Sequence, residues 1–127
     1  MTQRDGCMRY EHIDVSRITR LADELTNDAS ACLRFIDDYI SAWEHRQARV
    51  ATAVDRVVID DALAALLSLS TSSAMLGAQG LSLAARALYA EARLLGTIPA
   101  RGADRLVRIG DAVCMELRLA SAEMRAA

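Results

Sequence analysis

The sequence contains no lysine, one proline and only five aromatic side chains, and each scarcity narrows what the chain can be. All fifteen basic residues are arginine, and seventeen acidic residues bring the net charge to −2. Because nucleic-acid-binding domains usually carry a basic excess, this balance argues against that class. Few aromatics and a lone Pro99, set against 24 alanines, favour helices over strands.

Long hydrophobic runs and paired cysteines are also missing. No apolar stretch reaches the ~18 residues of a membrane span, and Met1 to Glu11 lacks the apolar core of a signal peptide. The cysteines, an odd number without a close pair, predict reduced thiols and a cytoplasmic protein: Cys7, Cys32 and Cys114. Since 53% of the 127 residues are hydrophobic, we expect one domain over residues 1–127, with a flexible leader over 1–12.

Apolar residues recur every three or four positions in five segments, which predicts five helices. Short connections between them predict an all-α, antiparallel up-down four-helix bundle with a short leading helix. Gly77 and Gly96 should end the third and fourth helices, Asp60 and Asp61 should cap the third, and Pro99 should prevent the fourth from continuing. The first expected helix has Asp14 as its N-cap, and the second begins near Ala29 and runs for about 28 residues. The last three are expected from Ala62 to Leu76, from Gly80 to Leu95 and from Ala103 to Met124.

Signatures of enzymes and metal sites are thin. The sequence has no glycine-rich phosphate loop, no cysteine pair at metal spacing and no His-Glu-x-x-His, so no metal or other cofactor is expected. His12 in the leader and His45 among charged residues are interpreted as solvated surface histidines. Adjacent aspartates such as Asp37 and Asp38 point about 100° apart on a helix and form no facing acid pair. The helical row Arg101, Arg105 and Arg108 could bind phosphate, but neighbouring aspartates favour a solvated face.

One long segment is almost free of charge. From Ala62 to Ala90 the only charged side chain is Arg86, although a helical hairpin in a bundle normally fills its exposed half with charges. Two interpretations stand side by side: a soft, alanine-rich surface, or a face on which a partner docks.

A run of small and apolar residues within this segment has a recognisable pattern: Leu67-Ser-Leu-Ser-Thr-Ser-Ser-Ala-Met-Leu-Gly-Ala78. It resembles the signature of histidine-containing phosphotransfer (HPt) domains, in which His-x-x-Lys-Gly is followed by small residues and Leu-Gly. Ile13 to Leu25, the break at Asn27-Asp28 and the stretch Phe35 to Ile40 resemble that family's opening helices. The resemblance implies the family's helical bundle and, as partner, a receiver domain or a sensor histidine kinase.

The phosphoaccepting histidine of that family is missing. Aligned on Leu76-Gly77, the histidine position holds Leu67, the lysine position Ser70 and the glycine position Thr71, and no histidine follows His45. Leucine has no nucleophile, and a serine phosphoester is too stable to donate readily to an aspartate. The sequence therefore predicts a non-phosphorylatable binding module rather than an enzyme, docking through Leu63, Leu67, Ser70, Thr71 and Ala74. The alternatives are phosphotransfer through His45, and a structural or oligomerising bundle, with a homodimer as one form.

The docking hypothesis requires Leu67 on the surface. Two stripes on the third helix fit helical spacing, and periodicity does not choose between them. The stripe that keeps Leu76 inside, as the resemblance implies, centres about 130° from Leu67 and predicts that Leu67 faces solvent. The first stripe is Leu63, Leu66, Leu67, Ser70 and Ala74, and the second is Ala62, Leu66, Leu69, Ser73 and Leu76.

Overall fold

The computed structural model describes residues 10–24, 29–54, 56 and 58–126, and the helices take up most of them. No strand occurs within these ranges, where the only β-type pairing is an isolated bridge between Val54 and Ile98. The all-helical prediction is therefore confirmed. The helices are α2 (Val15–Glu24), α3 (Ala29–Ala53), α4 (Asp60–Met75), α5 (Gln79–Leu95) and α6 (Ala100–Ala126).

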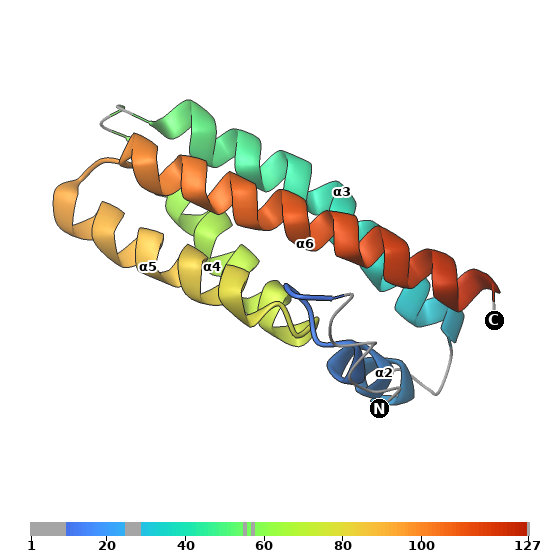
Figure 1. Ribbon diagram of the computed structural model, residues 1–127. Coiled ribbons are helices and arrows are strands. Elements are labelled where there is room, and N and C mark those ends of the chain that lie inside the picture. The colour runs from blue at the N-terminus through green and yellow to red at the C-terminus, as the bar shows by residue number, and fades with distance from the viewer. Residues whose placement is uncertain (1–9, 25–28, 55, 57, 127) are drawn as a thin grey trace.

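The helices differ in length, and this sets how they pack. α3 packs on α4, α4 on α5, α5 on α6, and α6 packs back on α3. At 1.5 Å per residue, α3 and α6, with 25 and 27 residues, extend about 40 Å, whereas α4 and α5, with 16 and 17, extend only about 25 Å. Figure 1 shows α4 and α5 beside one part of the long pair, and α2 near the other end, where α6 finishes.

The N-terminal segment helps to cover the part of the long helices that α4 and α5 do not reach. Tyr10 and Ile13 are buried, the backbone N–H of His12 donates to Glu116 Oε1 at 2.8 Å, and the His12 ring contacts the other carboxylate oxygen. The Tyr10 hydroxyl also donates to Glu123. Residues 10–12, expected as part of a flexible leader, thus contact α6 through Tyr10 and His12, and Tyr10 is buried. Residues 1–9 lie outside the described residues.

The helix ends match the sequence in part. Asp14 precedes α2 as expected, and its carboxylate accepts from the N–H of Ser16 at 3.0 Å and from the Ser16 hydroxyl. This hydroxyl, ahead of all other causes, lowers the pKa of Asp14. Asp60 and Asp61, expected as caps, instead form the first turn of α4, where they still complement the positive end of the helix dipole. α6 begins at Ala100, three residues earlier than expected, because Pro99 suits the start of a helix as well as the end of one.

Gly77, at the end of α4, packs against Asp14, at the start of α2. Its φ of +73° is easy only for glycine, and its N–H donates to the carbonyl of Ala74 while Ala78 N–H donates to Ser73, which closes the helix. A Cβ at Gly77 would lie 2.7 Å from Asp14 Cβ and 2.9 Å from Asp14 O. The glycine is thus needed both for the backbone conformation of the turn and for the close packing of Asp14 against it.

Gly96 offers a matched control, because it has nearly the same φ, +76°, with nothing within 4 Å of an added Cβ. We expect Gly96→Ala to lower the free energy of unfolding by about 1–2 kcal/mol, the cost of a left-handed alanine. Gly77→Ala should cost at least about 1 kcal/mol more, because Asp14 must move. Urea unfolding followed by circular dichroism measures both. Equal costs would mean that the contact with Asp14 is unimportant.

Gly110 in α6 makes room for the one tryptophan of the chain. A Cβ there would lie 2.1 Å from two carbons of the Trp43 ring, which is 2% exposed and donates through Nε1 to Asp111 at 3.1 Å. At the contact between α3 and α6, the Trp43 ring thus packs directly against the backbone of Gly110.

Alanine normally stabilises a helix by up to about 1 kcal/mol relative to glycine. At position 110 we expect the opposite, a loss of about 1–3 kcal/mol, because the ring must be displaced. The fluorescence emission of Trp43 should shift to longer wavelength, because the displaced ring becomes exposed to solvent. Gly80→Ala is the control, since nothing lies within 4 Å of a Cβ there. A Gly110→Ala protein that is more stable and has unchanged emission would contradict this packing.

Candidate docking surface

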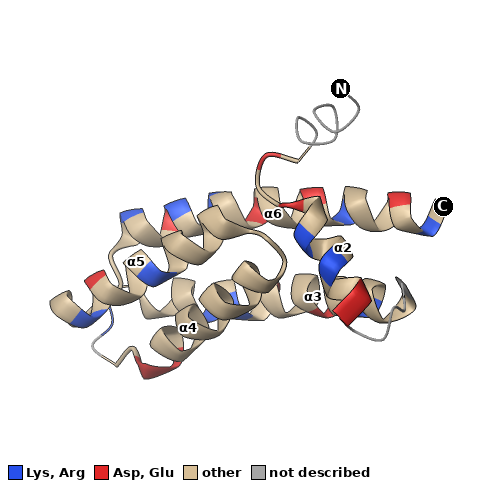
Figure 2. Ribbon diagram, turned by 90° about the horizontal axis from the view of Figure 1, so that it is seen from below, with Lys and Arg blue, Asp and Glu red and all other residues tan. Residues whose placement is uncertain are grey.

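The outward side of α4 carries no charge beyond its first turn. We define the α4 face as the residues of this helix that are at least partly exposed after Asp61: Leu63, Ala64, Leu67, Ser68, Thr71, Ser72, Ala74 and Met75. In Figure 2 the acidic start of α4 is the only coloured part of the helix. The face therefore offers apolar and hydroxyl groups and no charged side chain of its own.

Leu67 lies on this face, as predicted. It is 47% exposed, whereas the second stripe is buried throughout, with Leu66 and Leu76 fully covered. Met75, 42% exposed, is a second large apolar side chain that is exposed on the face. Of the expected docking residues, Thr71 is exposed and Leu63 and Ala74 are half-buried.

Ser70 does not belong to the surface, and its assignment to the docking face is wrong. It is 2% exposed, and its carbonyl accepts from the Ser82 hydroxyl of α5 at 2.7 Å. The physical reason is that α4 packs on both α3 and α5, so its buried arc is wider than one stripe. Ser70 lies on the α5 side of that arc, where small residues let the two helices approach.

Arg46 of α3 borders the α4 face, and no sequence pattern singled it out. Its guanidinium donates to the Ser68 hydroxyl at 2.9 Å and to the Ser72 hydroxyl at 3.3 Å. A positive charge is thereby held at the α3 edge of the α4 face. In the sequence, only the spacing of Ser68 and Ser72, one helical turn apart, indicates that one side chain could bind both hydroxyls.

Beneath the face, Tyr39 of α3 and Ser73 of α4 join their hydroxyls at 2.7 Å in the core. Burial is the main cause that raises the pKa of Tyr39 above its usual range. Burial likewise raises the pKa of Cys32 and raises that of Cys114 to about 11, and neither thiol is in a disulfide. These groups are therefore neutral at physiological pH.

The other candidate residues are dispersed. His45 is exposed on α3 and makes no hydrogen bond or ion pair with any described residue, while His12, expected in solvent, is partly covered beside Glu116. Asp37 pairs with Arg125 at 3.0 Å on the surface. The helical row on α6 is exposed and has no ion-pair partner in the described part of the chain: Arg101, Arg105 and Arg108.

No group of three or more histidine, cysteine, aspartate or glutamate side chains that could hold a metal ion occurs among the described residues. Within the same residues, no helix is both long and apolar enough to cross a membrane. Comparison with models of protein families, with curated proteins and with solved structures gives no match. The assignment of a partner therefore rests on the residues of the α4 face.

The exposure of Leu67 can be tested against that of its neighbour. We expect Leu67→Asp to change the free energy of unfolding by no more than about 0.5 kcal/mol, because the side chain already meets water. Leu66→Asp should cost more than about 3 kcal/mol, since it places a carboxylate in a fully buried site. Urea unfolding of the two variants makes the comparison. A Leu67→Asp protein that unfolds would place Leu67 in the core.

Proposed function

We propose that this chain is an HPt-like protein of two-component signalling, with the family's antiparallel up-down arrangement of α3 to α6. In this role it binds a receiver domain or a sensor kinase through the α4 face and relays no phosphoryl group. The observation that carries the proposal is the half-exposed Leu67, which stands where the resemblance puts the phosphoaccepting histidine.

The cost of exposing Leu67 supports a partner. A buried leucine stabilises a fold by about 1.5–3 kcal/mol relative to an exposed one, and this site gives up part of that gain. No charged side chain on α4 beyond Asp61 would have to lose its hydration when a partner covers the face. Such a surface is typical of the apolar centre of a protein interface.

Arg46 supports a receiver as the partner in particular. The receiver's phosphoaccepting group is an aspartate, so its transfer site is acidic. Arg46 is held at the α3 edge of the α4 face by Ser68 and Ser72, where its charge would meet that acidic site at the rim of the interface. Charge complementarity of this kind favours the right partner and speeds association.

The missing nucleophile separates this role from that of a working phosphotransfer protein. Leu67 offers no atom that can accept a phosphoryl group, and the nearby hydroxyls of Ser68 and Ser72 are engaged with Arg46. Occupying a receiver without accepting phosphate would block the productive partner or hold the receiver in place. The protein would then act by competition or as a scaffold.

Binding to a panel of purified receiver domains from the same genome tests the proposal. We expect at least one to bind the full chain, and Leu67→Asp to weaken that binding tenfold or more because it sets a carboxylate against an acidic site. Met115→Asp is the matched control, since Met115 is 63% exposed on α6, away from the α4 face. Isothermal titration calorimetry measures the affinities.

Absence of binding to every receiver and to the cognate kinases, or equal loss in both variants, would refute the docking role. A second measurement addresses the chemistry. Incubated with a radiolabelled phosphorylated kinase or receiver, the chain should take up no acid-labile phosphate. Acid-labile label that disappears in His45→Ala would instead establish relay through His45.

A further inference from the structure

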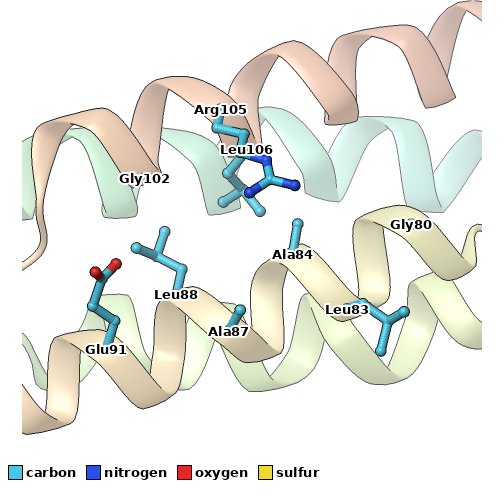
Figure 3. Close-up of a pocket in the computed structure, with 9 residues that line it drawn as sticks. All are labelled: Gly80, Leu83, Ala84, Ala87, Leu88, Glu91, Gly102, Arg105 and Leu106. Carbon is cyan, nitrogen blue, oxygen red and sulfur yellow. The ribbon is translucent and has the colours of Figure 1, made fainter.

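Helix α5 carries two apolar stripes on opposite sides. The first is buried against the rest of the molecule and includes Leu81, Ala85, Leu88 and Ala92. The second, which we name the outer stripe, is exposed at every position, with Leu83 62% and Leu94 87% exposed. In Figure 3, Leu83 points away from α6 while Leu88 points toward it. The outer stripe consists of Gly80, Leu83, Ala87, Ala90 and Leu94.

The spacing of the outer stripe is that of a coiled-coil seam. Its members are separated by three, four, three and four residues, so they occupy successive a and d positions of a heptad along nearly all of α5. The outward side of a helix in an isolated bundle is normally polar. An exposed side with this period is suited to pack against another helix.

Three charged residues flank the outer stripe. With Gly80 at a, Arg86 and Arg93 are at g on one side, and Glu91 is at e on the other. Arg93 lies over the ring of Tyr89 on its own helix, 5.8 Å from the ring centroid. Arg86 and Glu91 are exposed, and neither forms an ion pair with a described residue. These two are five residues apart on their own helix, whereas pairing within a helix needs three or four.

The same two residues would meet across a pair of helices. In a parallel pair, position g of one helix faces position e of the next heptad in the other, which sets Arg86 against Glu91 of a second copy, twice by symmetry. In an antiparallel pair, g faces g, and Arg86 would meet its own copy. The charges therefore favour a second copy of this chain, in parallel orientation, as the occupant.

The surroundings leave room for such a neighbour. A groove of about 590 Å³ between α5 and α6 runs beside the stripe and is lined by Gly80, Ala84, Ala87 and Gly102 among others (Figure 3). Nothing lies within 4 Å of a Cβ added at Gly80, so the single chain has no steric need for glycine there. Small side chains along a seam allow two helix backbones to approach closely.

We propose that two copies of this chain associate through the outer stripes of α5, parallel and related by a two-fold axis, with Arg86 of each copy paired with Glu91 of the other. The contact is isologous, so it closes as a dimer. It uses a single helix of each copy and lies at the small end of protein interfaces, which makes the association weak and reversible. It does not involve the α4 face and is independent of the proposed function.

Sedimentation equilibrium of the full chain, between about 10 µM and about 1 mM, tests the dimer. We expect the wild type to shift from monomer to dimer over this range and to shift less at high salt. R86E, which would set acid against acid across the pair, and E91R, which would set base against base, should each associate at least tenfold more weakly. An equimolar mixture of the two should recover the association, because acid then meets base on both sides.

Leu94→Glu should also weaken the dimer tenfold or more, whereas Met115→Glu, a change at a similarly exposed residue of α6, should leave it unchanged. Circular dichroism checks that all variants keep their helices, as expected for substitutions of exposed residues. A wild type that is monomeric at about 1 mM, charge variants that associate like the wild type, or a mixture that does not recover would each overturn the proposal.

Discussion

The unequal lengths of the helices are the constraint on which the rest of this structure depends. α3 and α6 extend about 15 Å beyond what α4 and α5 cover, and the apolar side chains along that extra length need a cover of their own. The segment from Tyr10 to Glu24 supplies it, anchored through His12 to Glu116 and through Asp14 against Gly77. Without this segment, the fully buried Cys32 of α3, whose thiol donates to the carbonyl of Ile18 at 3.7 Å, would lose part of its surroundings.

The α4–α5 hairpin illustrates how packing creates both candidate surfaces. Its two helices approach through small residues such as Ser70 and Ser82, whose hydroxyls lie 3.2 Å apart, and each helix keeps one side turned outward. These outward sides are poor in charge. On α4 the exposed leucine shares its face with two serines that hold a positive charge from α3, whereas on α5 the exposed leucines form a regular seam flanked by arginines on one side and an acid on the other. The first surface is suited to an acidic globular partner, and the second to a copy of itself.

Sequence periodicity predicted more of the fold than of the candidate site. Helix existence and the turns at Gly77 and Gly96 follow from local rules, because they depend on spacing and backbone conformation within one segment. Spacing alone left two possible stripes on α4, and the exposure of Leu67 was predicted only by taking the stripe that keeps Leu76 inside. Ser70 was misplaced because one helix buried by two neighbours has a wider covered arc than a single stripe suggests. Arg46 was not selected, since its contact with Ser68 joins residues 22 positions apart.

The sequence by itself determined an all-helical chain, the breaks between its helices, a hairpin with few charges and the absence of a nucleophile at position 67. These are properties of composition and short-range spacing, in which each residue acts through its nearest neighbours along the chain. Only the tertiary structure decided that Tyr10 belongs to the core, that Gly110 makes room for Trp43, and that Arg46 borders the α4 face. Such contacts depend on how far each helix extends and which neighbour it meets, and no local pattern contains that information.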